Sequence, residues 1–180
     1  MSVVIVDYGS GNLRSAAKAF ERAAADTATA ISVSSDPKAL KAASHIVLPG
    51  VGAFADCKRG LEGVAGMIEA LEEAVIGEGK PFLGICVGMQ LMAKTGHEHG
   101  AHQGLGWIDA KVTAIDTPAG VAGADRASFK IPHMGWNDLE VRDPSHPLFS
   151  GIETGRHVYF VHGYRILCER PGDVIAEVDY

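Results

Sequence analysis

The stretch Gly84-Ile85-Cys86-Val87-Gly88 constrains the fold of this chain more than any other. The apolar run 80–83 before it predicts a buried strand, and the apolar residues 87–94 after it predict a helix that ends before Gly96. Cys86 therefore lies where a strand turns sharply into a helix, with a glycine two residues away on each side. This is the pattern of a nucleophile elbow, in which a larger side chain at either glycine would collide across the turn.

The elbow predicts that Cys86 is a nucleophile, because the turn projects the thiol outward and the amides at the start of the next helix favour a thiolate. The alternative is a buried structural cysteine, and the flanking strand and helix favour the nucleophile. Acyl transfer also needs oxyanion donors, a base and a group that orients the base. The Val87 amide and the loop 50–52 can supply the donors. The downstream histidines His133, His146, His157 and His162 have no carboxylate after them that suggests a base and its orienting partner.

Alternating strand and helix patterns predict an α/β fold with a doubly wound, mostly parallel sheet flanked by helices. The predicted strands of the first half are Val3–Val6, Ala30–Ser34 and residues 46–48, and the predicted helices are residues 13–25, 37–42 and 64–76. After Trp107 the pattern changes, and we expect additional antiparallel strands at 107–115, 137–141, 157–164 and 174–178. Residues 119–124 predict a loop of small residues, and residues 144–147 predict a turn. No linker or repeat interrupts residues 1–180, so we expect a single domain.

Composition excludes several functions. A net charge of −6 without a Lys/Arg cluster argues against nucleic-acid binding, and no apolar run approaches the length needed to span a membrane. The chain enters a strand at once without a cleavage signal, and its three cysteines form no C-x-x-C pair, so we expect a cytoplasmic protein without a disulfide framework. Gly9-x-Gly11 lacks the third glycine of a dinucleotide site. The histidines of segment 97–102 lack partner ligands at a defined spacing, which favours a solvated loop; we expect no metal and no cofactor.

Two motifs resemble a known family. Pro49-Gly50-Val51-Gly52-Ala53-Phe54 and Gly84-Ile85-Cys86-Val87-Gly88-Met89-Gln90 resemble the oxyanion loop and nucleophile elbow of class I glutamine amidotransferases. The segments 7–15, 132–137 and 159–165 narrow this resemblance to the glutaminase subunits of imidazole glycerol phosphate synthase, from histidine biosynthesis. The likeness runs from residue 2 to residue 180, and Met134-Gly135-Trp136-Asn137 is its most specific part.

The resemblance implies that Cys86 attacks the side-chain amide of glutamine, releases ammonia and forms a thioester that water hydrolyses to glutamate. It implies that the ammonia passes to a (β/α)₈-barrel cyclase, the partner subunit. The residues that it assigns are Val51, Gly52 and Val87 as the oxyanion hole, Gly52 and Gln90 as substrate-binding residues, Asn12 as support for the oxyanion loop, and Trp136 and Tyr159 at the partner interface.

Two departures from the family pattern matter. Gly163 stands where the family usually has serine or threonine near the substrate. The family's base and its orienting residue lie in a His-Pro-Glu motif beyond the position of Tyr180, and no His-Pro-Glu occurs in these 180 residues. We therefore expect a C-terminally truncated form that is inactive as it stands. The alternatives are a non-catalytic subunit that binds the partner, and a glutaminase of another pathway such as anthranilate synthesis, against which the Met-Gly-Trp-Asn segment argues.

Overall fold

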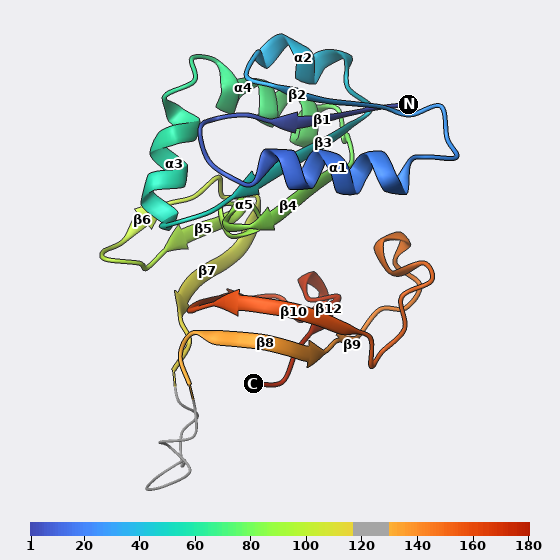
Figure 1. Cartoon of the computed structure of the whole chain (residues 1–180). Coiled ribbons are helices and arrows are strands. Elements are labelled where there is room, and N and C mark those ends of the chain that lie inside the picture. The colour runs from blue at the N-terminus through green and yellow to red at the C-terminus, as the bar shows by residue number, and fades with distance from the viewer. Residues whose placement is uncertain (117–129) are drawn as a thin grey trace, which may run out of the picture. The chain divides into compact units, whose positions relative to one another are not determined.

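The computed structural model describes residues 1–116 and 130–180, and the chain divides into two compact units, Met1–Trp107 and Ile108–Tyr180 (Figure 1). The loop expected at 119–124 lies outside the described residues. Within the described ranges, every helix is too short or too polar to cross a membrane.

The first unit is built on a parallel sheet with the strand order β2-β1-β3-β4. Its strands are β1 (Ser2–Val6), β2 (Ala30–Ser34), β3 (His45–Gly50) and β4 (Phe82–Cys86). β1 and β3 consist largely of buried residues, which is typical of parallel strands covered on both faces. The sheet confirms the predicted α/β class, and the carboxyl ends of β1, β3 and β4 meet at one edge of it.

Helices flank this sheet. α1 (Leu13–Ala23) lays its apolar residues on the face formed by Val3, Ile5 and Val47. The residues that alternate with these on β1 and β3 are also buried, so the opposite face is covered as well. The remaining helices of the unit are α2 (Pro37–Ala42), α3 (Phe54–Glu62), α4 (Met67–Leu71), the π-helical turn η1 (Glu72–Gly77) and α5 (Val87–Gln90).

The helix predictions at 64–76 and 87–94 differ from the structure, and one helix was not predicted. The helix expected at 64–76 begins only at Met67, because Gly66 adopts a left-handed conformation. The helix expected at 87–94 ends at Gln90 and is followed by β5 (Ala93–Gly96), which pairs antiparallel with β6 (His102–Gln103). Backbone hydrogen bonds from residues 104–106 to carbonyls in 91–94 draw that segment out of the helix. α3 was not predicted.

The second unit consists of short antiparallel pairs, which confirms the antiparallel character expected after Trp107. β7 (Ile108–Ala114) pairs with β11 (Tyr164–Cys168), β8 (His133–Asp138) with β10 (His157–His162), and β9 (Glu140–Val141) with β12 (Ala176–Glu177). The 3₁₀ turns η2 (Pro147–Phe149) and η3 (Pro171–Asp173) lie between strands. The single strand expected at 157–164 is instead two successive strands. β10 ends at His162, β11 begins at Tyr164, and Gly163 lies between them.

Candidate active site

Cys86 occupies the turn that the sequence predicts. It is the last residue of β4 and the N-cap of α5, with φ 55° and ψ −119°. L-residues rarely adopt this conformation, and strained backbone of this kind concentrates at functional sites. The Cys86 side chain is exposed. The turn therefore presents a strained, accessible thiol at the carboxyl end of the sheet.

The two flanking glycines are required by close backbone approach. A Cβ on Gly84 would lie 2.5 Å from Met89 Cα, and a Cβ on Gly88 would lie 1.8 Å from the carbonyl oxygen of Leu48. Both contacts are with backbone atoms, which cannot move aside as the end of a side chain can. The elbow is thus packed directly on β3 with no room for a side chain at either position.

The predicted oxyanion loop begins beside the nucleophile. Gly50 at the end of β3 is the register partner of Cys86, so residues 51–53 leave the sheet next to the thiol. Gly52 has φ +91°, and a Cβ there would meet nothing within 4 Å. Val87 is the first residue of α5, where backbone N–H groups have no intrahelical acceptor. The roles of the Gly52 and Val87 amides as oxyanion donors stay predictions.

Val51 is held by two side chains at its backbone. Its N–H donates to Ser10 Oγ at 3.1 Å, and its carbonyl oxygen lies 2.9 Å from Ser10 Oγ and 3.2 Å from the Cys57 thiol, which both donate to it. The Val51 amide is therefore engaged by Ser10 in this conformation. Its role as an oxyanion donor stays a prediction.

The loop after β1 supports the oxyanion loop through residues that the sequence analysis did not single out. The Tyr8 hydroxyl donates to the carbonyl oxygen of Pro49 at 2.8 Å, and Ser10 binds Val51. Burial, together with the nearby Cys57 thiol, raises the pKa of Tyr8, so its hydroxyl stays a donor. Asn12 accepts the Ser15 N–H and caps α1, and its role in supporting the oxyanion loop stays a prediction. The signal for Tyr8 and Ser10 was their place directly after a buried parallel strand.

Gln90, the predicted substrate-binding residue, is buried on α5. Near it in sequence, Glu98 accepts the N–H of Phe54 at 2.7 Å and so caps α3, which begins just after the oxyanion loop. Its neighbours His97 and His99 are exposed. Across residues 1–116 and 130–180, His, Cys, Asp and Glu side chains form no cluster of three or more that could hold a metal ion.

In the second unit, the paired strands β8 and β10 carry an exposed aromatic pair. Trp136 and Tyr159 are register partners, and their rings meet edge to face with centroids 5.5 Å apart. They are 69% and 52% exposed. Met134 and Val161, the next pair on the same face, are also exposed, so this outer face is an apolar patch rather than core.

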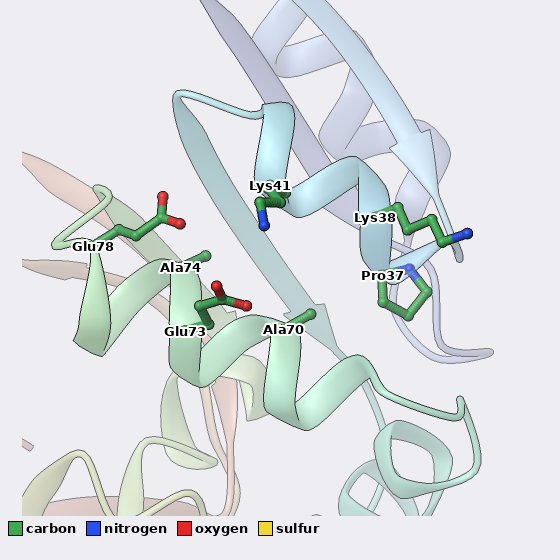
Figure 2. A pocket seen from close by; sticks show the side chains of 7 residues that line it. All are labelled: Pro37, Lys38, Lys41, Ala70, Glu73, Ala74 and Glu78. Carbon is green, nitrogen blue, oxygen red and sulfur yellow. The ribbon is translucent and has the colours of Figure 1, made fainter.

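A separate hollow of about 170 Å³ lies between α2 and the α4–η1 segment (Figure 2). Lysines of α2 and glutamates of η1 and the residue after it line it together with small apolar side chains, and it contains none of the predicted site residues. Beside it, the Lys80 ammonium donates to the carbonyl oxygens of Leu40 and Lys41 at 3.0 and 2.7 Å. These two hydrogen bonds cap the end of α2, so the charged side chain of Lys80 has a structural role.

Comparisons with known proteins show the family of this chain. The model of the family "Glutamine amidotransferase class-I" matches residues 4–176. Among solved structures, one described as a glutamine amidotransferase aligns with a TM-score of 0.63 at 19% identity, covering 96% of this chain and 78% of that one. A glutamine amidotransferase from Thermotoga maritima aligns with a TM-score of 0.57 at 17% identity, covering 94% and 64%. These two similarities to solved structures show the fold alone. The family match shows that the chain belongs to the class-I glutamine amidotransferases.

Curated relatives narrow the class. Proteins named imidazole glycerol phosphate synthase subunit HisH from Rhodospirillum rubrum and Rhizobium meliloti are each 54% identical to this chain, over all of its length and 82% of theirs. A HisH subunit from Rhodopseudomonas palustris is 51% identical with the same coverage. Within its family, the chain therefore groups with the HisH subunits.

Proposed function

We propose that this protein is the glutaminase subunit of an imidazole glycerol phosphate synthase, a cytoplasmic enzyme of histidine biosynthesis, and that residues 1–180 form one amidotransferase domain. Together with a general base, this domain hydrolyses glutamine to glutamate and ammonia. The observation that carries the proposal is the strained, exposed Cys86 between two glycines that close backbone packing requires. The HisH relatives support the same activity.

The chemistry follows from the elbow. The Cys86 thiolate attacks the side-chain amide carbon of glutamine, and the C=O electron pair moves onto the oxygen. The amides of Val87 and of the Val51–Gly52 loop stabilise that oxyanion. Collapse of the intermediate expels ammonia once the nitrogen has gained a proton, and water then cleaves the glutamyl thioester. Gln90 and Gly52 hold the substrate, and Asn12 supports the loop.

Protonation of the leaving nitrogen and deprotonation of the attacking water need a group that can gain and lose a proton. The His-Pro-Glu motif supplies this general base in the family. None of the 180 residues provides that motif. We therefore propose that this polypeptide, tested alone, hydrolyses glutamine no faster than its Cys86→Ala variant. In related enzymes, loss of one member of a catalytic triad costs on the order of 10⁴-fold in rate.

Glutamine turnover tests both proposals. A chain extended by a segment that carries His-Pro-Glu should release ammonia from glutamine, and Cys86→Ala in that extended chain should abolish the release. Persistence of turnover in the extended Cys86→Ala variant would refute the assignment of the nucleophile. Turnover by the 180-residue chain above its own Cys86→Ala control would refute the proposed inactivity alone.

The ammonia acceptor is a (β/α)₈-barrel cyclase subunit, and we propose that the outer face of β8 and β10 docks against it. Exposed aromatic residues that cluster on one face are typical anchors of protein interfaces. Trp136→Ala should weaken a one-to-one complex with the cyclase by at least tenfold, measured by light scattering and calorimetry. Val33→Ala, on the exposed edge strand β2, is the matched control and should leave the affinity unchanged.

A non-catalytic subunit that binds the partner is the second candidate. It predicts the same complex but no glutamine turnover after the extension.

A further inference from the structure

The inner face of the proposed docking strands carries a pair of histidines, of which His133 is buried and His162 half-buried. Side chains alternate along a strand, so the neighbours of Met134 and Val161 point to the opposite face. These neighbours are His133 and His162, which are register partners at the end of the β8–β10 pair. The His133 side chain is only 3% exposed, and its Nδ1 lies 3.0 Å from His162 Nε2.

The hydrogen bonds fix where the protons lie. His162 Nδ1 is 2.8 Å from the carbonyl oxygen of Tyr164, which can only accept, so this nitrogen carries the hydrogen. In the neutral ring, His162 Nε2 is then an acceptor, and His133 Nδ1 must donate to it. The neutral pair is therefore joined by one shared N–H, and this bond requires that His162 Nε2 stay unprotonated.

The surroundings reinforce the neutral state. Phe160 from β10 stacks on His133 with ring centroids 4.8 Å apart, and Tyr180 stacks on it with centroids 3.8 Å apart. The titratable groups packed against His133 are thus the His162 imidazole and the Tyr180 phenol. Burial, and then the positive charge that His162 can carry, lower the pKa of His133.

Protonation of both rings would break the shared hydrogen bond. A first proton on His133 Nε2 leaves the Nδ1–H of His133 donating to His162 Nε2, whereas a further proton on His162 Nε2 places two N–H groups opposite each other. A second proton leaves two imidazolium rings facing each other at this distance in a largely buried place, which is strongly unfavourable. Within residues 1–116 and 130–180, β8 and β10 form a two-stranded sheet, and such a pair has little stability of its own, so it would fray from this end. The adjacent Met134–Val161 pair on the outer face would separate first.

We propose that His133 and His162 form a proton-sensitive lock that holds the β8–β10 strands in the geometry that docks the partner. This inference rests on the proposed partner-docking role of the outer face. Because docking requires the shared hydrogen bond, uptake of the second proton opposes docking, and affinity falls as the pH falls. One linked proton raises Kd by up to about tenfold per pH unit.

The first test needs no partner. Nitrogen NMR of the imidazole rings in the free chain at about pH 8, where histidines are neutral, should find the hydrogen on Nδ1 of both His133 and His162. Amide exchange of β8 and β10 should accelerate between about pH 6.5 and pH 5 relative to β1 and β3, after correction for intrinsic exchange. A hydrogen on Nε2 of His162, or uniform exchange behaviour across these strands, would overturn the lock.

The second test measures Kd for the cyclase subunit over the same pH range. His162→Gln keeps an acceptor for His133 without a titrating ring, and His133→Gln keeps a donor for His162. We expect both variants to bind at neutral pH and to lose most of the acid-induced weakening. The matched control is His157→Gln. It removes an exposed histidine of β10, the strand of His162, whose Nε2 lies 3.1 Å from the Asp138 carboxylate on β8.

The outcomes separate the two proposals. His157→Gln should retain the full acid effect; if it abolishes the effect while the Gln variants at 133 and 162 retain it, the pair is not the sensor. If either Gln variant does not fold, the other decides. If the folded wild-type chain does not bind the cyclase at any pH, the proposed docking role is wrong. The histidine lock is then tested by the NMR measurements alone.

Discussion

The strain at Cys86 makes a quantitative prediction about stability. A non-glycine residue at φ 55° and ψ −119° costs on the order of 1–3 kcal/mol, whereas glycine adopts this region freely. Glycine also widens the unfolded ensemble, which costs about 0.5–1 kcal/mol relative to alanine. The difference leaves Cys86→Gly more stable than Cys86→Ala by about 0.5–2 kcal/mol. For a chain of this size, that difference corresponds to a Tm higher by about 1–8 °C.

Urea unfolding followed by circular dichroism, with calorimetry for Tm, measures this difference. The matched control is Ala30→Gly on β2, an exposed strand position without positive φ, where glycine should destabilise by about 0.5–1 kcal/mol. The sign of the alanine-to-glycine change should thus be opposite at the two positions. If Cys86→Gly is less stable than Cys86→Ala by the same amount as at the control, the elbow stores no strain and the reasoning is wrong.

Three further predictions follow from the same unit. Gly88→Ala should prevent folding, since its Cβ would lie 1.8 Å from a backbone oxygen of β3; soluble, cooperatively unfolding protein would contradict this. Iodoacetamide should modify the exposed Cys86 well before the buried Cys57 in the folded chain, as read by peptide mapping, and faster labelling of Cys57 would count against the elbow. Lys80→Met should lower the free energy of unfolding by about 1–2 kcal/mol because it removes two charged hydrogen bonds to the end of α2; an unchanged urea midpoint would refute that capping role.

Local signals in the sequence were sufficient for several elements. Strand β2 and helix α2 have the predicted bounds, because a β-branched segment and the Asp36-Pro37 start signal act within a few residues. The elbow was predictable for the same reason, since the glycines two residues on either side of Cys86 are a local steric requirement. The strand predicted at 46–48 proved longer, because its pairing with β4 continues through Pro49 and Gly50.

Other elements depend on residues far away in the chain. Helix α3 has an alanine at its N-cap, which cannot cap it, and Glu98 instead accepts the N–H of Phe54 from 44 residues further on. The helix expected at 87–94 is cut short by pairing with residues 102–106. No pattern of residues within a window of this length contains those partners, so sequence periodicity alone could not find them.

The candidate site divides in the same way. The sequence by itself determined the elbow cysteine, its glycines and the glycine-rich loop at the end of a neighbouring strand, because each depends on backbone sterics within a few residues. Only the tertiary structure decided that the Val51 amide is bound by Ser10, that Tyr8 and Cys57 hold the oxyanion loop, and that Trp136 and Tyr159 are exposed while His133 is buried behind them. These facts depend on strand register and on contacts between distant segments, which are fixed only when the whole unit packs.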